Sequence, residues 1–192
     1  ITTIDDTTKF TFDNLEYGHT YTVSQQPVSP YVESKNDWDF VNTLLMYIHK
    51  NVYDTDGNDI DGDLVNTGQT IRYQITVGQN SDGDTPVTVF DQLPIEVEFV
   101  SADEGVTVIA TADDLEAYNQ LAAESGYEQV PEKFSDLTSP VLVYQAQGIN
   151  AEAESFSYYV KVKDSAEEKY IYNSASGFFH TDNQSAEIIS NE

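Results

Sequence analysis

Apolar and polar side chains alternate along most of the chain from residue 44 onward, which is the pattern of strands that bury one face. Valine, isoleucine, threonine and aromatic residues, which favour extended backbone, are frequent in these stretches. Glycine, proline, asparagine and aspartate gather between them and indicate turns. The expected strands are 44–53, 70–77, 87–93, 96–100, 141–145, 155–163, 170–179 and 186–190. Many short strands separated by turns predict a sandwich of two packed β-sheets.

One segment departs from this alternation and has the pattern of a helix. The run T-A-D-D from Thr111 is a capping-box start, and Gly126 is suited to end a helix. Between them, an apolar stripe at helical spacing is formed by Leu115, Tyr118 and Ala122. The segment carries no distinctive chemistry, which favours a helix that covers a sheet edge. Long insertions also carry binding sites, so a receptor site on this helix and its neighbouring loops stays open as an alternative.

The first predicted strand places a lysine where a core residue is expected. With a period of two, one face of this strand is formed by Met46, Ile48, Lys50 and Val52. An isolated ammonium group inside a core is very costly. Lys50 must therefore extend to the surface, pair with a carboxylate or lose its proton. A neutral amine would be a nucleophile.

Two other polar residues stand in the apolar phase of their strands, Asp91 within 87–93 and Asn173 within 170–176. A neutral Lys50 could attack the side-chain carbonyl of Asn173. A protonated Asp91 would polarise that carbonyl and carry protons as ammonia leaves. The product would be one neutral amide in place of two costly polar groups. The alternative is a salt bridge between Lys50 and Asp91, with Asn173 as an ordinary buried hydrogen-bonding residue.

Four runs between Lys50 and Asn191 carry a family resemblance. They are K-N-V-Y-D-T-D-G-N-D-I-D-G-D-L-V-N-T-G-Q-T-I-R-Y-Q-I-T-V, V-F-D-Q-L-P, I-Y-N-S-A-S and I-I-S-N. This pattern resembles the isopeptide-forming domains of Gram-positive fimbrial subunits and fibrillar adhesins, in which a first-strand lysine bonds to the asparagine of a late N-x-A strand with the help of an acid. The resemblance implies these three roles for Lys50, Asn173 and Asp91. It also implies an all-β fold, an immunoglobulin-like β-sandwich with one inserted α-helix.

The first 35 residues have a pattern of their own. Two alternating strands around a turn predict a hairpin, and the run from Phe10 to Val23 fits F-x-F-x-x-L-x-x-G-x-x-Y-x-V. This pattern is similar to the second half of the B-type repeats of Gram-positive collagen adhesins and pilins. Gln25 stands where that family has the glutamate that assists its own bond. We expect residues 1–35 to be a small N-terminal β segment, the tail of such a repeat without its own bond, and residues 36–192 to form the sandwich.

The charge and composition exclude several classes of function. The chain has 34 acidic against eight basic residues, a net charge of -26, so nucleic acid and anionic membrane surfaces would be repelled. No stretch reaches the roughly 20 apolar residues that span a bilayer, so membrane insertion of this segment is not expected. There is no cysteine, which excludes disulfides, thiolate metal sites and cysteine nucleophiles. Common hydrolase, phosphate-loop and dinucleotide motifs do not occur.

An acidic loop from Asp54 to Asp63 has part of a calcium-binding pattern. Asp54, Asp56 and Asn58 have the spacing of the first three calcium ligands. The sixth position lacks the required glycine, and the twelfth is Val65 where glutamate is needed. An acidic turn is therefore the favoured interpretation, with calcium as the alternative and no other cofactor expected.

These observations predict a structural module of a bacterial adhesin or pilus rather than an enzyme, because the bond would form once per molecule. The module is expected outside the cell, at the surface, with anchoring to the cell wall through regions beyond this segment. Its expected partners are neighbouring domains of the same surface protein. The alternative adds a host protein or glycan, recognised through the helix insertion.

Overall fold

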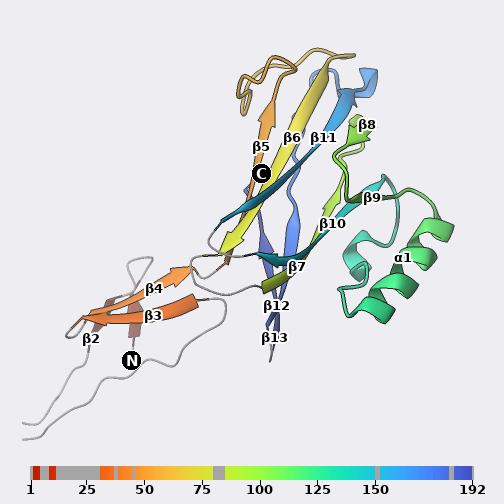
Figure 1. Cartoon of the computed structure of the whole chain (residues 1–192). Coiled ribbons are helices and arrows are strands. Elements are labelled where there is room, and N and C mark those ends of the chain that lie inside the picture. The colour runs from red at the N-terminus through yellow and green to blue at the C-terminus, as the bar shows by residue number, and fades with distance from the viewer. Residues whose placement is uncertain are drawn as a thin grey trace, which may run out of the picture.

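The computed structural model describes residues 2–4, 9–11, 31–36, 39–44, 46–79, 85–149, 152–181 and 184–191. Two antiparallel sheets dominate it (Figure 1). The four-stranded sheet runs in the order β5 (Met46–Tyr53), β6 (Thr70–Gln79), β11 (Glu154–Val162), β8 (Val97–Ala102). The five-stranded sheet runs in the order β13 (Gln184–Ile189), β12 (Ser176–Thr181), β7 (Thr85–Gln92), β10 (Val141–Ile149), β9 (Val106–Ile109).

The strand order is that of an immunoglobulin-like sandwich. The sequence β5-β6-β11-β8 corresponds to the A-B-E-D sheet of that fold, and β13-β12-β7 corresponds to its G-F-C sheet. Strands β9 and β10 extend the second sheet beyond β7. The predicted all-β sandwich with one inserted helix is thereby confirmed.

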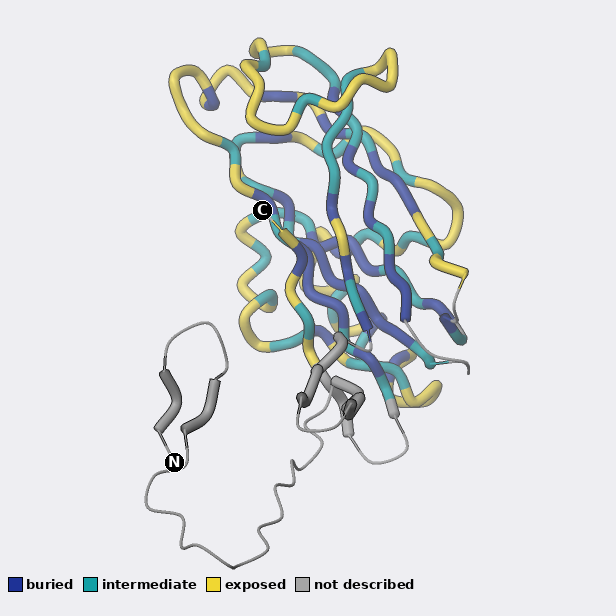
Figure 2. Tube along the Cα trace, turned by 90° about the vertical axis from the view of Figure 1, so that its left-hand side faces the viewer, coloured by how far each residue is buried: buried dark blue, intermediate teal, exposed yellow. Residues whose placement is uncertain are grey.

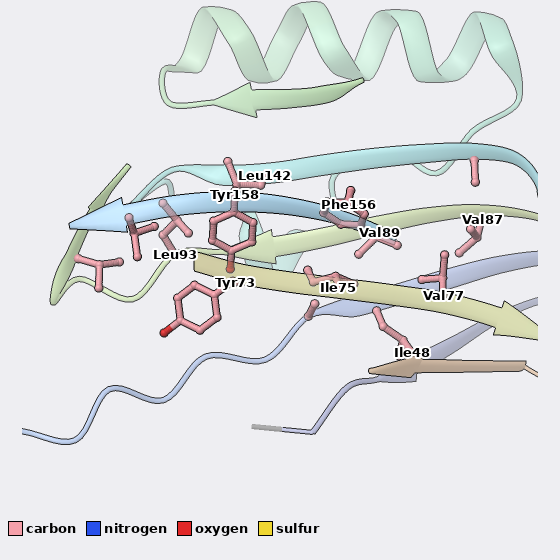
Figure 3. Packing of buried hydrophobic residues seen from close by; sticks show 14 of the residues in the cluster. Ile48, Tyr73, Ile75, Val77, Val87, Val89, Leu93, Leu142, Phe156 and Tyr158 are labelled. Carbon is pink, nitrogen blue, oxygen red and sulfur yellow. The ribbon is translucent and has the colours of Figure 1, made fainter. Parts of the chain in front are cut away.

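The core lies between the two sheets, and alternation along the strands builds it most clearly in β6. In β6, Ile71, Tyr73, Ile75 and Val77 are buried, whereas the residues between them are partly exposed. The inward faces of β5, β7 and β11 contribute in the same way, so buried segments line the inside of both sheets (Figure 2). Tyr158 of β11 and Tyr73 lie next to each other in this core, with ring centroids 5.3 Å apart (Figure 3).

Strand β7 is buried on both of its faces, because a second apolar cluster covers the outer face of its sheet. The helix α1 (Ala112–Ser125) places Tyr118 and Ala122 in this cluster, together with Phe90 of β7 and Ile109 of β9. The predicted capping box at Thr111 is present, as is the left-handed residue at Gly126. The helix lies against β9, the edge strand of its sheet, and its buried residues also cover the outer sheet face beside that edge.

Three strand predictions are corrected by the structure. The predicted strand 170–179 is paired only from Ser176 onward. Strand β9 is an additional strand that the expected set lacks; it follows β8 after the turn at residues 103–105, where Gly105 has a positive φ of 90°. The first strand begins at Met46 and is preceded by the separate strand β4 (Asp39–Leu44). Two short 3-10 helices are also present, Glu132–Phe134 and Asp164–Ala166.

The N-terminal part contributes two small antiparallel pairs. Strand β1 (Thr2–Ile4) pairs with β2 (Lys9–Thr11), and β3 (Tyr31–Asn36) pairs with β4. The second strand of the predicted hairpin, around Tyr21 and Val23, lies outside the described residues, as does Gln25. The division between residues 35 and 36 falls at the end of β3 and stays a prediction.

Candidate functional site

Lys50 and Asp91 meet in the core of the sandwich. The central part of β5 carries Lys50 inward, as the alternation of Met46 and Ile48 predicts, and β7 carries Asp91 toward it from the opposite sheet. The Lys50 Nζ lies 2.6 Å from Asp91 Oδ2. Lys50 is 4% exposed and Asp91 is 0% exposed. Lys50 therefore does not extend to the surface but pairs with a carboxylate in the core.

Burial makes the charged form of Lys50 costly. Removal from water lowers the pKa of its ammonium group from 10.5 to about 8, although the charge of Asp91 and the hydrogen bond to it act in the opposite direction. The rings of Tyr73 and Tyr158 lie 4.8 and 5.6 Å from Nζ and give the cation some compensation. Proton transfer from Lys50 to Asp91 would leave two neutral groups, which a dry core tolerates better than an ion pair.

Tyr158 connects this pair to Asn173. Its hydroxyl donates to Asp91 Oδ2 at 2.6 Å and accepts from Asn173 Nδ2 at 2.9 Å. Asn173 is 7% exposed and Tyr158 is fully buried. A continuous chain of hydrogen bonds thus runs from the lysine amine through the carboxylate and the phenol to the asparagine amide. All four members come from different segments of the sandwich.

Two oxygen atoms at this site have no hydrogen-bond partner among the described residues. They are Asp91 Oδ1 and the amide oxygen of Asn173, and both are buried. Buried acceptors without a donor are rare and costly. If Asp91 takes the proton of Lys50, that proton crosses the 2.6 Å contact to Oδ2 and the pair becomes neutral, while Oδ1 gains no partner. Proton transfer thus removes two buried charges and leaves both unpartnered oxygens in place.

The two buried tyrosines stay protonated at this site. Burial and then the negative charge of Asp91 raise the pKa of Tyr158 well above its ordinary value. Burial and then the negative charge of Asp91 also raise the pKa of Tyr73, whereas a hydrogen bond with the side chain of Asn173 acts to lower it. Tyr158 can therefore act as a hydrogen-bond donor to Asp91 across the range of pH in which Lys50 titrates.

The segment that carries Asn173 is extended without being part of a sheet strand. Along 170–175 exposure still alternates: Tyr170 and Tyr172 are 83% and 66% exposed, whereas Asn173 and Ala175 are buried. The alternation expected from the sequence is therefore present, although the pairing with β7 begins only at Ser176. This places the Asn173 side chain inside the sandwich.

In the acidic loop from Asp54 to Asp63, the carboxylate of Asp54 accepts hydrogen bonds from within the loop. Asp54 Oδ1 accepts from the backbone N–H groups of Asp56 and Asn58, and Oδ2 accepts from the Asn58 side chain. These bonds, led by that of the Asn58 side chain, lower the pKa of Asp54. Among the described residues, no cluster of three or more histidine, aspartate or glutamate side chains has the arrangement of a metal site. Calcium binding by this loop stays untested.

Comparison with known proteins yields structural likenesses alone. No family model matches the sequence, and a search of curated proteins finds no significant match. The full-length major pilin SpaD of Corynebacterium diphtheriae is similar over 78% of this chain and 35% of its own, with 17% identity and a TM-score of 0.46. The major pilin subunit BcpA of Bacillus cereus is similar over 84% of this chain and 46% of its own, with 13% identity and a TM-score of 0.44.

This chain thus spans between about a third and a half of the length of these pilins. At 17% and 13% identity, with TM-scores of 0.46 and 0.44, these likenesses carry no argument about function. The strand order of the two sheets identifies the fold.

The sequence pattern named three of the four residues in the hydrogen-bonded chain. Tyr158 was missed, although it stands in the apolar phase of β11 between Phe156 and Val160. A tyrosine in that phase buries a hydroxyl that needs a partner, which is the signal that could have identified it. Tyr73 gave the same signal in β6.

Proposed function

We propose that this chain is a structural module of a bacterial surface pilus or adhesin, in which Lys50 and Asn173 form an intramolecular isopeptide bond. The observation that carries the proposal is the buried chain Lys50, Asp91, Tyr158, Asn173, with its short contacts and its unpartnered oxygens. A site of this composition is poorly suited to stability alone, because buried ion pairs rarely repay their desolvation. It is well suited to a reaction that removes the charges.

The reaction needs no group beyond these side chains. The Lys50 ammonium gives one proton to Asp91, and the neutral amine attacks Cγ of Asn173. A C–N bond forms as the bond from Cγ to Nδ2 breaks. One hydrogen of the lysine nitrogen passes to the leaving nitrogen by way of the carboxyl group, so ammonia departs neutral and Asp91 ends protonated. The dry core prevents water from competing with the amine.

A bond at this position suits a load-bearing role. It would join β5, the first strand of the sandwich, to the segment before β12 in the opposite sheet. Tension along the chain would then pass through a covalent link rather than through hydrogen-bonded strands. We place such a module at the cell surface, with neighbouring domains or subunits of the same fibre as its partners. In the described part of the chain, no helix has the length and apolarity to span a bilayer.

The alternative, ligand binding through the helix insertion, has less support. The buried side chains of α1 pack on the outer face of the five-stranded sheet, and the 3-10 segment that follows contributes Phe134 to the same cluster. These contacts explain the insertion as a cover for apolar residues of the sheet.

Intact-mass measurement tests the proposed bond directly. The folded protein is expected to be lighter than its sequence mass by one ammonia, and digestion should release a branched peptide that contains Lys50 and Asn173. Lys50→Ala should remove the deficit, whereas Lys161→Ala, which changes an exposed lysine of β11, should retain it. A folded wild-type protein of full sequence mass would leave the Lys50–Asp91 salt bridge as the correct interpretation.

A further inference from the structure

The last two described residues bind both of the segments that would react. The N–H group of Lys50 donates to Asn191 Oδ1 at 2.9 Å, and Asn191 Nδ2 donates to the carbonyl oxygen of Lys50 at 2.7 Å. One side-chain amide thus holds both backbone groups of the residue that carries the amine. The C-terminal end of the described chain accordingly lies beside β5 (Figure 1).

This contact replaces a missing neighbour strand. Among the described strands, β5 is an edge strand of its sheet, so its backbone groups that point away from β6 face no neighbouring strand, apart from a bridge between Tyr53 and Asp59. Two residues further along, the outward carbonyl of Val52 accepts from the N–H group of Ile60 at 3.1 Å. The Asn191 side chain likewise binds the outward backbone of Lys50, where its oxygen accepts from the N–H group and its nitrogen donates to the carbonyl oxygen. It therefore fixes β5 at the position of the nucleophile.

The preceding residue holds the other reacting segment. Ser190 N–H donates to the carbonyl oxygen of Ala175 at 2.9 Å, and Ser190 Oγ accepts from the Ala175 N–H group at 2.9 Å. The Ser190 hydroxyl in turn donates to the carbonyl oxygen of Asn191 at 2.7 Å. Ala175 lies two residues after Asn173, on the same side of the extended segment, and both are buried.

We propose that Ser190 and Asn191 form a clamp that positions Lys50 and Asn173 for bond formation. Consecutive Cα atoms are about 3.8 Å apart, so two neighbouring residues that bind two segments fix the spacing between those segments. The clamp acts on the backbone and leaves both reacting side chains free to meet. Neither residue touches the reacting atoms, so both are positioning residues. The inference rests on the proposed bond and adds the device that brings its partners together.

The rate of ammonia loss tests the clamp. Protein made by cell-free synthesis is sampled after synthesis is stopped, quenched in denaturing acid and weighed intact. Asn191→Ala is expected to form the bond ten- to a hundredfold more slowly than wild type, since misplacement by about 1 Å can cost that much. Ser190→Ala and Asn191→Asp should also be slower, the second because it loses the donor to the Lys50 carbonyl.

Asn119→Ala is the matched control. Asn119, a residue of α1, accepts with Oδ1 from the Val130 N–H group at 2.8 Å, which is a comparable amide-to-backbone bond. This variant should react at the wild-type rate. Each substitution is also made together with Asn173→Ala, so that no bond can form and the unfolding midpoint reports folding alone. The rates are then compared at a temperature at which every variant is folded. If Asn191→Ala does not fold, Ser190→Ala and Asn191→Asp decide the question.

The outcomes separate this inference from the proposed function. A wild-type deficit with unchanged rates in the folded Ser190 and Asn191 variants would overturn the clamp and leave the bond intact. The clamp would also be overturned if the Ser190 and Asn191 substitutions lower stability in the Asn173→Ala background but do not slow the reaction when Asn173 is present. Such a result would show a structural role alone. A wild-type protein that never loses ammonia would overturn the bond and, with it, the positioning role.

Discussion

At the residue scale, the protonation state of Lys50 controls what the site can do. The ion pair with Asp91 and the neutral pair contain the same number of protons, so the reactive form is reached by moving one proton over a 2.6 Å contact. Burial lowers the pKa of Lys50 and thus the cost of this transfer. Tyr158 keeps the accepting carboxylate and the Asn173 amide in one hydrogen-bonded line.

The pH dependence of stability should reveal the lowered pKa of Lys50 when the bond cannot form. In Asn173→Ala, the folded state loses the lysine proton near pH 8, whereas the unfolded state keeps it until about 10.5. Between these values the unfolded state binds more protons, so the free energy of unfolding should rise as pH increases from 8 toward 10. Denaturant titrations at several pH values measure this slope.

The control for this slope carries Lys50→Met, Asp91→Asn and Asn173→Ala together. It retains Tyr73 and Tyr158, whose raised pKa values act in the opposite direction above pH 10 because their folded state then binds more protons. The difference between the two variants isolates the Lys50 pair. Equal slopes from pH 8 to 10 would contradict a lysine pKa near 8.

The hydroxyl of Tyr158 should matter for the rate of bond formation. Tyr158→Phe keeps the ring but removes the donor to Asp91 and the acceptor for Asn173. We expect a decrease in the rate of roughly ten- to a hundredfold, the usual scale for one positioned polar group. The measurement is again the mass deficit over time. Tyr159→Phe, a partly buried neighbour on the opposite face of β11, should react normally, and equal rates in both variants would remove Tyr158 from the mechanism.

At the scale of elements, β7 contributes residues to both apolar clusters, the one between the sheets and the one beneath the helix. Its inward face carries Asp91 between the sheets, and its outward face carries Phe90 beneath the helix, where the Phe90 and Tyr118 rings meet edge to face at 6.1 Å. Covering the outer face lets this strand be apolar on both sides, as is usual for fully buried strands. The helix therefore packs on the outer face of the strand that holds Asp91, on the side opposite the Lys50–Asp91 pair.

Loss of the helix cap should lower stability and leave the bond unaffected. The Thr111 hydroxyl accepts from the Asp114 N–H group, and the Asp114 carboxylate accepts from the Thr111 N–H group. Thr111→Ala removes one half of this capping box and should cost about 1 kcal/mol of unfolding free energy. Thr111→Ser retains the hydroxyl and should cost much less. A slower ammonia loss in Thr111→Ala would show that the helix contributes to the reaction after all.

At the scale of the whole molecule, the bond would close a loop that contains most of the sandwich. By analogy with disulfides, closure of a loop of about a hundred residues contributes roughly 4 to 5 kcal/mol, chiefly by restricting the unfolded chain. Asn173→Ala should therefore unfold at clearly lower temperature and denaturant concentration than wild type. Calorimetry of the two proteins measures the difference, and identical transitions would argue against a covalent link.

Single-molecule stretching provides a second test of the bond at this scale. When the unbonded Asn173→Ala variant unfolds under tension, the chain between residues 50 and 173 is released, which adds on the order of 400 Å at about 3.4 Å per residue. The bonded wild type should lack this increment, because tension passes from β5 directly to the segment before β12. An equal increment in both proteins would show that the loop is not closed.

The sequence by itself determined the fold class and the phase of the critical residues. Alternation with a period of two is a local consequence of strand geometry, so the inward direction of Lys50 and Asp91 could be predicted without knowing their neighbours. The burial of Asn173 followed in the same way, although its segment is unpaired. The helix ends were predictable because Thr111 and Gly126 act through bonds within a few residues.

Tertiary structure alone decided which residues meet. Sequence phase shows that a side chain points inward but not how far it lies from another one, since strand order depends on packing between segments distant in sequence. The link through Tyr158 and the hold of Asn191 on Lys50 join positions 67 and 141 residues apart from their partners. The helix covers the outer sheet face as well as the edge strand β9. The outward side of β7 carries the apolar Phe90, and no local pattern shows which segment packs on it.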